Sequence, residues 1–387
     1  MLNTFINNKK RVLVFATVYL PFIGGAELAL KEISDRIGDF EFDLVTARLD
    51  KKLPIAQKMG NISIFRVGEG NRLDKLFFPL RAFKVASALH DERKYGLVFS
   101  LMASYGGIVA WRFKRRFKEV PFILNLQEGR NFEKAGWLKM FMFRQIVKSA
   151  DLVTVISNYL KDIAFKNGAA ENGVRLIPNG VDVGKFDAQF SYGELFDLKD
   201  ELNIRPDDNV VISASRLNYK NGIDSLVKAM KHLGDNYKLI LVGDGEEKAS
   251  LVELSKSTGA PDRVIFMGSI SNDILPKFLK IADVFVRPSR SEGLGTAFLE
   301  AMASRIPVVA TPVGGIVDLV KSAETGVFCA VDSPISIAEK IKLVIEDKKI
   351  RENIVKNAFK MVKEKHEWNK IAEEYREVFI KIINPKF

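Results

Sequence analysis

Two glutamates, Glu292 and Glu300, stand in a pattern that suits the binding of sugar hydroxyls. A short apolar run, 283–286, predicts a buried parallel strand, and a helical pattern begins at Thr296. The loop between them contains two glycines, so the order is strand, glycine loop and helix. Glu292 precedes the helix and Glu300 lies about one turn inside it, so both carboxylates can border one pocket and accept hydrogen bonds from hydroxyls. The alternative is an ordinary turn that carries two solvated glutamates.

The same loop also suits a phosphate. Backbone N–H groups at a helix start point outward, and the helix dipole favours an anion there. Gly293 and Gly295 allow a phosphate or a sugar to approach the backbone closely. A second glycine pair, Gly24 and Gly25, opens a helix after the first predicted strand and offers a similar anion site. Since carboxylates bind hydroxyls rather than phosphates, the ligand that suits both features is a nucleotide sugar.

Two cations follow another predicted strand, 209–215. Arg216 and Lys220 lie just beyond the carboxyl end of this strand, where they can clamp a diphosphate. Arginine supplies a planar fork of donors and lysine a compact charge. When the bond between sugar and diphosphate breaks, negative charge grows on the leaving group, and fixed cations stabilise that transition state more than the ground state. The alternative is a pair of ordinary surface cations.

The residues around Glu292 also carry a family resemblance. The spacing Glu-x7-Glu, together with Pro288-Ser289, Ala301-Met302-Ala303 and the run 307–310, resembles the retaining GT-B glycosyltransferases of glycosyltransferase family 4. The resemblance covers essentially the whole chain. It implies an α/β protein of two Rossmann-like parallel-sheet domains that face a central cleft. It also implies a transferase that needs neither a metal ion nor a cofactor.

The resemblance assigns roles to individual residues. It implies a catalytic group of Arg216, Lys220 and Glu292. It places Gln127 and Glu128, after the strand 121–126, on the acceptor side. The donor would be bound by residues of three segments: Gly24, Gly25, Met267, Gly268, Gly293, Leu294, Gly295, Thr296 and Glu300.

Two positions depart from the family pattern. The family commonly has Lys directly before Gly222, whereas this chain has Asn221 there and Lys220 one residue earlier. Many relatives have His where this chain has Gln127. The three histidines, His90, His232 and His366, all lie in predicted helical stretches, so a histidine base is not expected. A retaining transfer does not require one, because the departing diphosphate can itself take the acceptor proton.

The positive charge of the chain is unevenly distributed. Its net charge is +11, and residues 1–184 contain 29 Lys and Arg against 18 Asp and Glu, whereas the remainder contains 30 of each. The segment 107–118 combines five cations with an apolar stripe, which is typical of a basic amphipathic helix. We expect this helix to dock on the anionic inner leaflet of a membrane, near a polyprenyl-linked acceptor. Alternatively, it packs on the sheet as a domain helix with a solvated basic face.

Apolar strands alternate with amphipathic helices along the chain, which predicts parallel sheets with helices on both faces. We expect an acceptor-binding domain over 1–184, a nucleotide-sugar-binding domain over 185–367, and a terminal helix, 368–387, that packs back on the first domain. The strands predicted for the first half are 11–18, 41–47, 62–67, 96–101, 121–126 and 152–156. Those predicted for the second half are 209–215, 238–242, 263–266, 283–286, 307–310 and 326–329.

The sequence therefore predicts a cytoplasmic, retaining hexosyltransferase that acts in polysaccharide or glycolipid biosynthesis. Its single cysteine, Cys329, fits a reducing compartment. No apolar stretch approaches the roughly 18 residues that a membrane span requires. A nucleotide-sugar 2-epimerase of the same fold and a non-catalytic sugar-nucleotide-binding subunit are alternatives. A nucleic-acid binder is not expected, because the chain has no recognisable nucleic-acid module.

Overall fold

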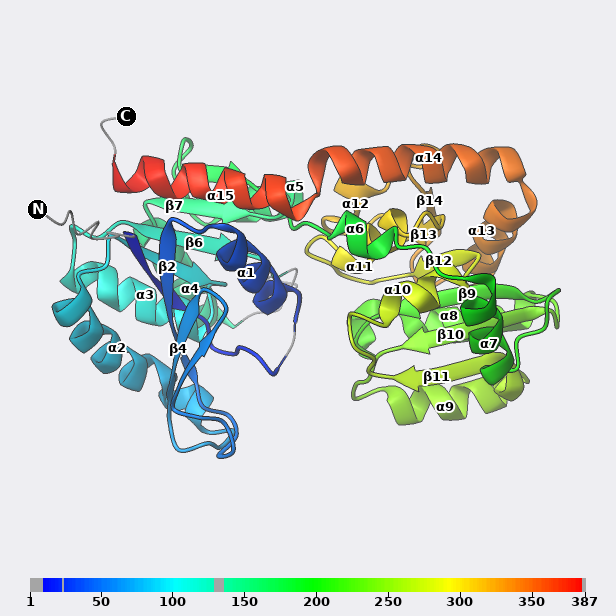
Figure 1. Ribbon diagram of the computed structural model, residues 1–387, viewed down its shortest axis with the longest axis horizontal. Helices are drawn as coiled ribbons and strands as arrows, with labels where there is room; N and C mark the ends of the chain where they lie inside the picture. The colour runs from blue at the N-terminus through cyan, green and yellow to red at the C-terminus, as the bar shows by residue number, and fades with distance from the viewer. Residues whose placement is uncertain (1–9, 23, 129–135, 385–387) are drawn as a thin grey trace, which may run out of the picture. The chain divides into compact units, whose positions relative to one another are not determined.

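A computed structural model describes residues 10–22, 24–128 and 136–384 of the chain. The chain forms two compact units, one of Met1–Asn179 with Trp368–Phe387 and one of Gly180–Glu367. The division falls between Asn179 and Gly180, a few residues before the boundary expected from the sequence. Each unit contains its own sheet (Figure 1).

The first unit is built on an eight-stranded sheet with the order β3-β4-β2-β1-β5-β6-β7-β8. All its neighbouring strands are parallel except β3 and β4, which pair antiparallel. The strands are β1 (Lys10–Phe15), β2 (Phe40–Ala47), β3 (Ala56–Met59), β4 (Ile62–Val67), β5 (Leu97–Leu101), β6 (Phe122–Leu126), β7 (Leu152–Val155) and β8 (Val174–Leu176). The helices are α1 (Gly25–Arg36), α2 (Asp74–Arg93), α3 (Tyr105–Arg116), α4 (Trp137–Ser149), α5 (Asn158–Lys166) and α15 (Trp368–Ile383).

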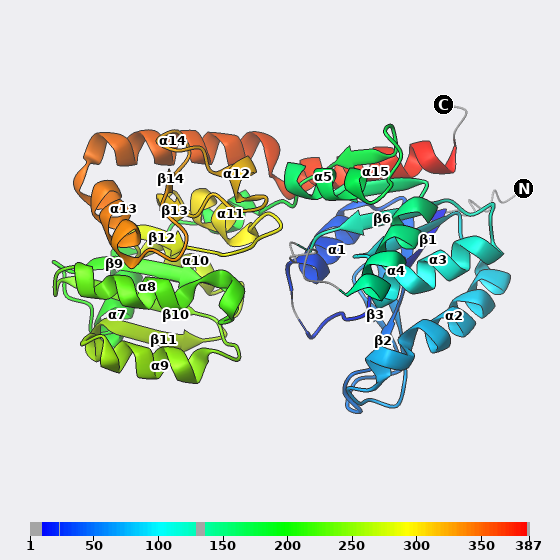
Figure 2. The same ribbon diagram turned by 180° about the vertical axis from the view of Figure 1, so that it is seen from behind.

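Helices cover both faces of this sheet (Figures 1 and 2). Val12 and Val14 of β1 belong to the same buried cluster as residues of α1 and α15. Phe15, whose side chain points to the other face of β1, packs against Phe113 of α3 with 6.1 Å between ring centroids. Because successive side chains of a strand point to opposite faces, β1 is buried on both sides. This explains why the central strands are continuous apolar runs rather than alternating ones.

The terminal helix α15 is fixed to the first unit by apolar packing and by a buried polar contact. The ring of Phe379 packs edge-on against Phe40 and Phe99, with 5.7 Å between centroids in each pair. The Asn125 amide, fully buried at the end of β6, donates to Tyr375 Oη at 2.8 Å. The helix α15 therefore completes a hydrophobic core that is formed mainly by residues from the first part of the sequence.

The second unit is built on a six-stranded parallel sheet with the order β11-β10-β9-β12-β13-β14. The strand order reverses between β9 and β12, and this reversal is where open α/β sheets bind ligands at their carboxyl edge. The strands are β9 (Asn209–Ala214), β10 (Tyr237–Val242), β11 (Val264–Gly268), β12 (Val284–Arg287), β13 (Val308–Ala310) and β14 (Val327–Phe328). The α-helices are α6 (Val183–Phe186), α7 (Tyr192–Glu201), α8 (Ile223–Ala229), α9 (Lys248–Ser257), α10 (Leu275–Lys280), α11 (Thr296–Ala303), α12 (Ile316–Leu319), α13 (Pro334–Glu346) and α14 (Lys348–Lys365), and short 3-10 turns are η2 (Tyr219–Asn221), η3 (Met230–His232) and η4 (Pro261–Arg263).

The predicted fold class, two α/β domains with parallel sheets, is confirmed. Two strands of the first unit, β3 and β8, were not predicted from the sequence. The residues of β3 are mostly exposed, so this edge strand lacks the apolar run that marks the others. The other missed strand, β8, has only three residues and is likewise mostly exposed. Both lie at the edges of the sheet, where burial imposes the weakest pattern on the sequence.

Candidate active site

The predicted catalytic residues of the second unit come from two neighbouring strands. Arg216 and Lys220 follow β9, and Glu292 follows β12. The two strands pair in parallel, with Val284 of β12 opposite Val211 of β9. Their carboxyl ends therefore meet at one edge, on the two sides of the point where the strand order reverses.

The loop after β9 exposes both cations. Arg216 and Lys220 are exposed, and within the described part of the chain neither side chain has an ion-pair partner. Asn221 is buried, with 3% of its surface exposed, and its Nδ2 donates to the Arg216 carbonyl at 2.6 Å. The residue that replaces the family lysine therefore shapes the loop from inside, while Lys220 remains on its surface.

Arg290 ties the loop after β9 to the loop after β12. Its guanidinium donates to the Tyr219 carbonyl at 2.6 Å and to Asp224 Oδ2 at 2.9 Å, and it lies 4.1 Å from the centroid of the Tyr219 ring. A further contact at 2.7 Å joins it to Asp332. Burial alone would lower the pKa of Arg290, but the hydrogen bonds to the two aspartates raise it above its usual value. No pattern in the sequence indicates this role, which depends on residues from three separate segments.

Two glycines allow the loops of the site to approach each other. Gly222 has φ +67°, and a Cβ there would lie 2.1 Å from the Pro288 carbonyl oxygen. Gly314 has φ +54°, and a Cβ there would lie 1.9 Å from the Glu292 carbonyl oxygen. That same oxygen accepts a hydrogen bond from Gly315 N at 3.1 Å. Any larger residue at either position would push the loop after β12 away from its neighbours.

Glu292 is held by a buried arginine. Arg287, the last residue of β12, is 6% exposed, and its Nη2 lies 2.7 Å from Glu292 Oε2. The other carboxylate oxygen accepts from Gly293 N at 2.9 Å. The guanidinium also lies 4.7 Å from the centroid of the Phe298 ring. Arg287 was not predicted as a site residue, although an arginine that ends the apolar run Val284-Phe-Val is a signal, because buried charges need a partner.

Glu300 lies in α11, and its side chain is only partly exposed. Burial raises its pKa to about 7, while the positive charges of Arg287 and Lys185 act in the opposite direction. Arg287 thus acts electrostatically on Glu300 and pairs directly with Glu292. The two glutamates of the sequence pattern are therefore brought to the same cation, and Glu300 changes its charge near neutral pH.

The remaining donor-side residues of the second unit lie along the same sheet edge. Gly295 precedes α11 with φ +95°, and no side chain caps that helix, so the N–H groups of its first turn, beginning at Thr296, are not bound by a capping group. Leu294 is buried, with 1% of its surface exposed, so its side chain packs inside the protein. Met267 and Gly268 end β11, which β10 separates from β9. Gly293 forms the hydrogen bond to Glu292 described above.

The first unit carries the other predicted residues. Gly24 precedes α1 in extended backbone and Gly25 begins the helix, again without a side-chain cap. A Cβ at Gly24 would lie 2.4 Å from Glu27 Oε2, so that carboxylate folds over the helix start. Gln127 follows β6, where its Oε1 accepts from Asn179 Nδ2 at 2.9 Å. Its Nε2 is buried without a hydrogen-bond partner among the described residues, and Glu128 follows at the same strand end.

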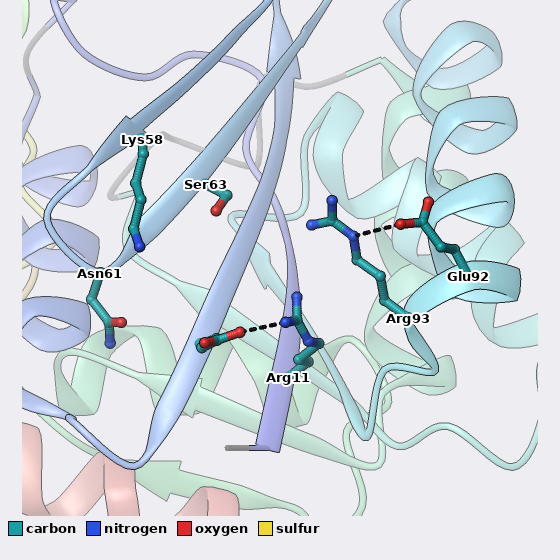
Figure 3. A pocket seen from close by; sticks show the side chains of 7 residues that line it. Arg11, Lys58, Asn61, Ser63, Glu92 and Arg93 are labelled. Carbon is teal, nitrogen blue, oxygen red and sulfur yellow. Dashed lines mark ion pairs between the residues drawn. The ribbon is translucent and has the colours of Figure 1, made fainter. Parts of the chain in front are cut away.

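A polar pocket in the first unit lies apart from these residues (Figure 3). Arg11 and Glu41, near the amino ends of β1 and β2, form an ion pair there at 2.7 Å, and Arg93 lies 3.7 Å from Glu92. Because ligands of parallel sheets bind at the carboxyl edge, this pocket is not part of the candidate site. Among the described residues, no group of three or more His, Cys, Asp or Glu side chains is arranged to hold a metal ion.

Comparison with known proteins identifies two family models in the chain. Residues 23–185 match Glycosyltransferase Family 4, and residues 196–361 match Glycosyl transferases group 1. An uncharacterized glycosyltransferase of Methanocaldococcus jannaschii is 33% identical over 60% of this chain and 60% of its own length. The GDP-mannose-dependent alpha-(1-6)-phosphatidylinositol monomannoside mannosyltransferase of Mycobacterium tuberculosis is 29% identical over 56% of this chain and 59% of its own.

The fold is also found among solved structures. Sucrose-phosphate synthase from Thermosynechococcus elongatus superposes with a TM-score of 0.88, at 21% identity, over 97% of this chain and 100% of that one. This likeness establishes that the two parallel-sheet units form the GT-B fold.

Proposed function

The chain belongs to the GT-B glycosyltransferases described by these two families, and we propose that it is a retaining hexosyltransferase that uses a nucleotide diphosphate sugar. The observation that carries the proposal is that the loop with Arg216 and Lys220 and the loop with Glu292 follow two neighbouring strands, at the strand-order reversal of the second unit. Two exposed cations and a fixed carboxylate at that edge match a ligand that contains both phosphates and hydroxyls.

In the proposed reaction, Arg216 and Lys220 bind the diphosphate of the donor. The bond between the anomeric carbon and the diphosphate oxygen breaks, and a bond from the acceptor hydroxyl oxygen to that carbon forms on the same face. The acceptor proton passes to an oxygen of the departing diphosphate. The two cations stabilise the charge that develops on this leaving group.

The carboxylates serve different parts of the donor. Glu292, held by Arg287, accepts hydrogen bonds from the transferred sugar, and Glu300 accepts them from the ribose. Gly24, Gly25, Met267 and Gly268 contact the donor through their backbones. Gln127 and Glu128 orient the acceptor, for which Gln127 Nε2, without a hydrogen-bond partner among the described residues, is a suitable donor.

The proposed acceptor is a glycan or a polyprenyl-linked sugar at the anionic inner leaflet, and the proposed location is cytoplasmic. The mycobacterial relative, by its name, is a mannosyltransferase for phosphatidylinositol monomannoside, which supports a lipid-linked acceptor. We propose that transfer requires no metal ion and no cofactor. No helix within the described residues combines the length and apolar composition of a membrane span.

Isothermal titration of the full chain against UDP-, GDP- and ADP-sugars tests this function. We expect one nucleotide to bind at least about tenfold more tightly than the others, and Arg216→Ala to weaken its binding. NMR of the product should show that the anomeric configuration is kept. The proposal is wrong if no nucleotide sugar binds, or if the bound donor is converted to its 2-epimer without transfer.

A further inference from the structure

An exposed apolar stripe occupies the first half of α2. Leu73, directly before the helix, and Leu76, Phe77 and Leu80 within it are 62%, 58%, 51% and 61% exposed. Their spacing places all four on one helical face. Single exposed apolar residues are ordinary on a protein surface, but a continuous stripe of this kind marks an interaction site.

The other face of the same helix is already buried. Phe78, Ala82 and Ala86 are fully buried, so α2 cannot turn its exposed stripe inward without losing them. The start of the helix is also fixed, because the buried carboxylate of Asp74 accepts hydrogen bonds from the N–H groups of Glu69, Gly70 and Asn71. The stripe therefore stays on the surface of the first unit.

The segment that contains the stripe is rich in positive charge. Residues 48–84 contain nine Lys and Arg and only three Asp and Glu, which accounts for more than half of the net charge of the chain. Two of the three acidic side chains, Glu69 and Asp74, are already paired with Arg81. The exposed cations of this region are Lys51, Lys52, Lys58, Arg72, Lys75 and Lys84.

The loop that carries two of these lysines lies beside the start of α2. A Cβ at Gly70 would lie 2.5 Å from Lys51 Cα, so the loops before β3 and before α2 pack against each other. Both views show these loops together at the lower end of the first unit (Figures 1 and 2). We call residues 51–55 and 72–80, with Lys84, the basic apolar tip.

We propose that the basic apolar tip docks the protein on an anionic lipid surface, with the stripe of α2 among the headgroups and the surrounding lysines and arginine against lipid phosphates. A membrane interface offers an apolar layer beneath an anionic one, which matches an apolar stripe flanked by cations. A second copy of the chain matches poorly, since a two-fold interface would bring identical positive surfaces together. This docking goes beyond the proposed sugar transfer and does not depend on it.

The helix α3, singled out in the sequence, presents a different surface. Its apolar residues Val109, Ala110 and Phe113 are fully buried in the first unit. Lys114 pairs with Asp151 at 2.7 Å, and Arg112 lies 4.7 Å from the centroid of the Phe83 ring. Of the five cations in 107–118, the exposed ones are Arg115 and Arg116 at the end of α3 and Lys118 just after it. The apolar residues available for docking are therefore those of the α2 stripe and not those of α3.

Co-sedimentation of the full chain with vesicles of phosphatidylglycerol and phosphatidylcholine tests the proposal. The parent should pellet with the anionic mixture, release as salt rises, and stay in solution with pure phosphatidylcholine. The triple variant Leu76→Ser, Phe77→Ser, Leu80→Ser should bind at least about tenfold more weakly, as should Lys51→Gln, Lys52→Gln, Lys75→Gln. The control Ile274→Ser, Ile335→Ser removes equally exposed apolar residues of the second unit and should bind like the parent.

Three outcomes would overturn the proposal. The first is a triple serine variant that pellets as well as the parent. The second is loss of binding in the α3 variant Arg115→Gln, Arg116→Gln, Lys118→Gln with binding kept in both tip variants. The third is a parent protein that is dimeric in light scattering and does not pellet with vesicles, while the triple serine variant is monomeric. Equal melting temperatures of the variants exclude unfolding, and nucleotide-sugar titration separately reports whether the transfer site is intact.

Discussion

Arg287 Nη2 lies 2.7 Å from Glu292 Oε2, and both side chains are largely withdrawn from solvent at 7% and 15% exposure. The pair joins the last residue of β12 to the first glutamate of the Glu-x7-Glu pattern. Because a charged group at such a site needs a partner, the orientation of Glu292 depends on a residue outside that pattern.

Arg287→Leu should therefore destabilise the protein by about 3 kcal/mol, since removing one member of a buried ion pair leaves the other charge uncompensated. The double variant Arg287→Leu, Glu292→Leu should be less destabilised than the single one, because no lone charge remains. Urea denaturation of the two variants gives both values. A double variant at least as unstable as Arg287→Leu would show that packing of Arg287 on Phe298, rather than the charge, is what matters.

In the loop after β9, the exposed cations Arg216 and Lys220 should affect turnover, whereas the buried Asn221 should affect stability. Arg216→Ala and Lys220→Ala should each lower turnover roughly 10²-fold, as the loss of a preorganised charge contact does, with unchanged melting temperatures because both side chains are exposed. Asn221→Ala should instead lower stability by about 1–3 kcal/mol, since it removes the buried hydrogen bond to the Arg216 carbonyl. Steady-state kinetics and thermal melting distinguish the two classes. A stable Asn221→Ala protein with the largest loss of turnover would contradict the placement of the clamp.

The raised pKa of Glu300 makes donor binding depend on pH. The carboxyl pKa rises from 4.5 to about 7 on folding, so the folded protein binds more protons between these values, and its stability from this group falls as pH rises through that range. Only the ionised carboxylate accepts hydrogen bonds through both oxygens. Nucleotide-sugar affinity should therefore increase as pH rises through about 7 and level off above it.

Titration calorimetry from pH 5.5 to 8.5 measures this dependence, and Glu300→Gln provides the control, because a glutamine does not titrate in this range. We expect weaker binding at high pH and a flat profile for that variant. Glu292→Ala should mainly slow transfer while nucleotide affinity is kept. A pH profile that survives in Glu300→Gln would assign the dependence to another group.

Substitution of a glycine by alanine should lower stability in the packed loops of the site and raise it in an open helix. Gly222→Ala would place a methyl group 2.1 Å from the Pro288 carbonyl and strain a φ of +67°, so it should destabilise the protein by more than about 2 kcal/mol. Gly193→Ala, in the helix α7 with no atom within 4 Å, should stabilise it by up to about 1 kcal/mol. Chemical denaturation compares them. Equal stability of the two variants would show that the loops have room to separate.

The sequence determined the features that local patterns encode. Apolar runs and glycine loops identified the buried strands and the loops at their carboxyl ends, because a parallel strand buried on both faces must be apolar throughout. The pattern around Glu292 also identified the family, because the glycines, the glutamates and the helix start follow one another along the chain. Edge strands such as β3 were not predicted, because they are not buried and lack an apolar run.

Only the tertiary structure decided which side chains meet and which apolar faces are covered. Asn221 turns inward and Lys220 outward because the Arg216 carbonyl needs a donor inside that loop. Arg287 pairs with Glu292 because the chain reverses between a strand end and a helix start. Helical periodicity reveals an apolar stripe on α3 and another on α2, yet the stripe of α3 packs in the core and that of α2 is exposed. Periodicity records how residues are spaced along a helix, whereas burial depends on the neighbours that the fold supplies.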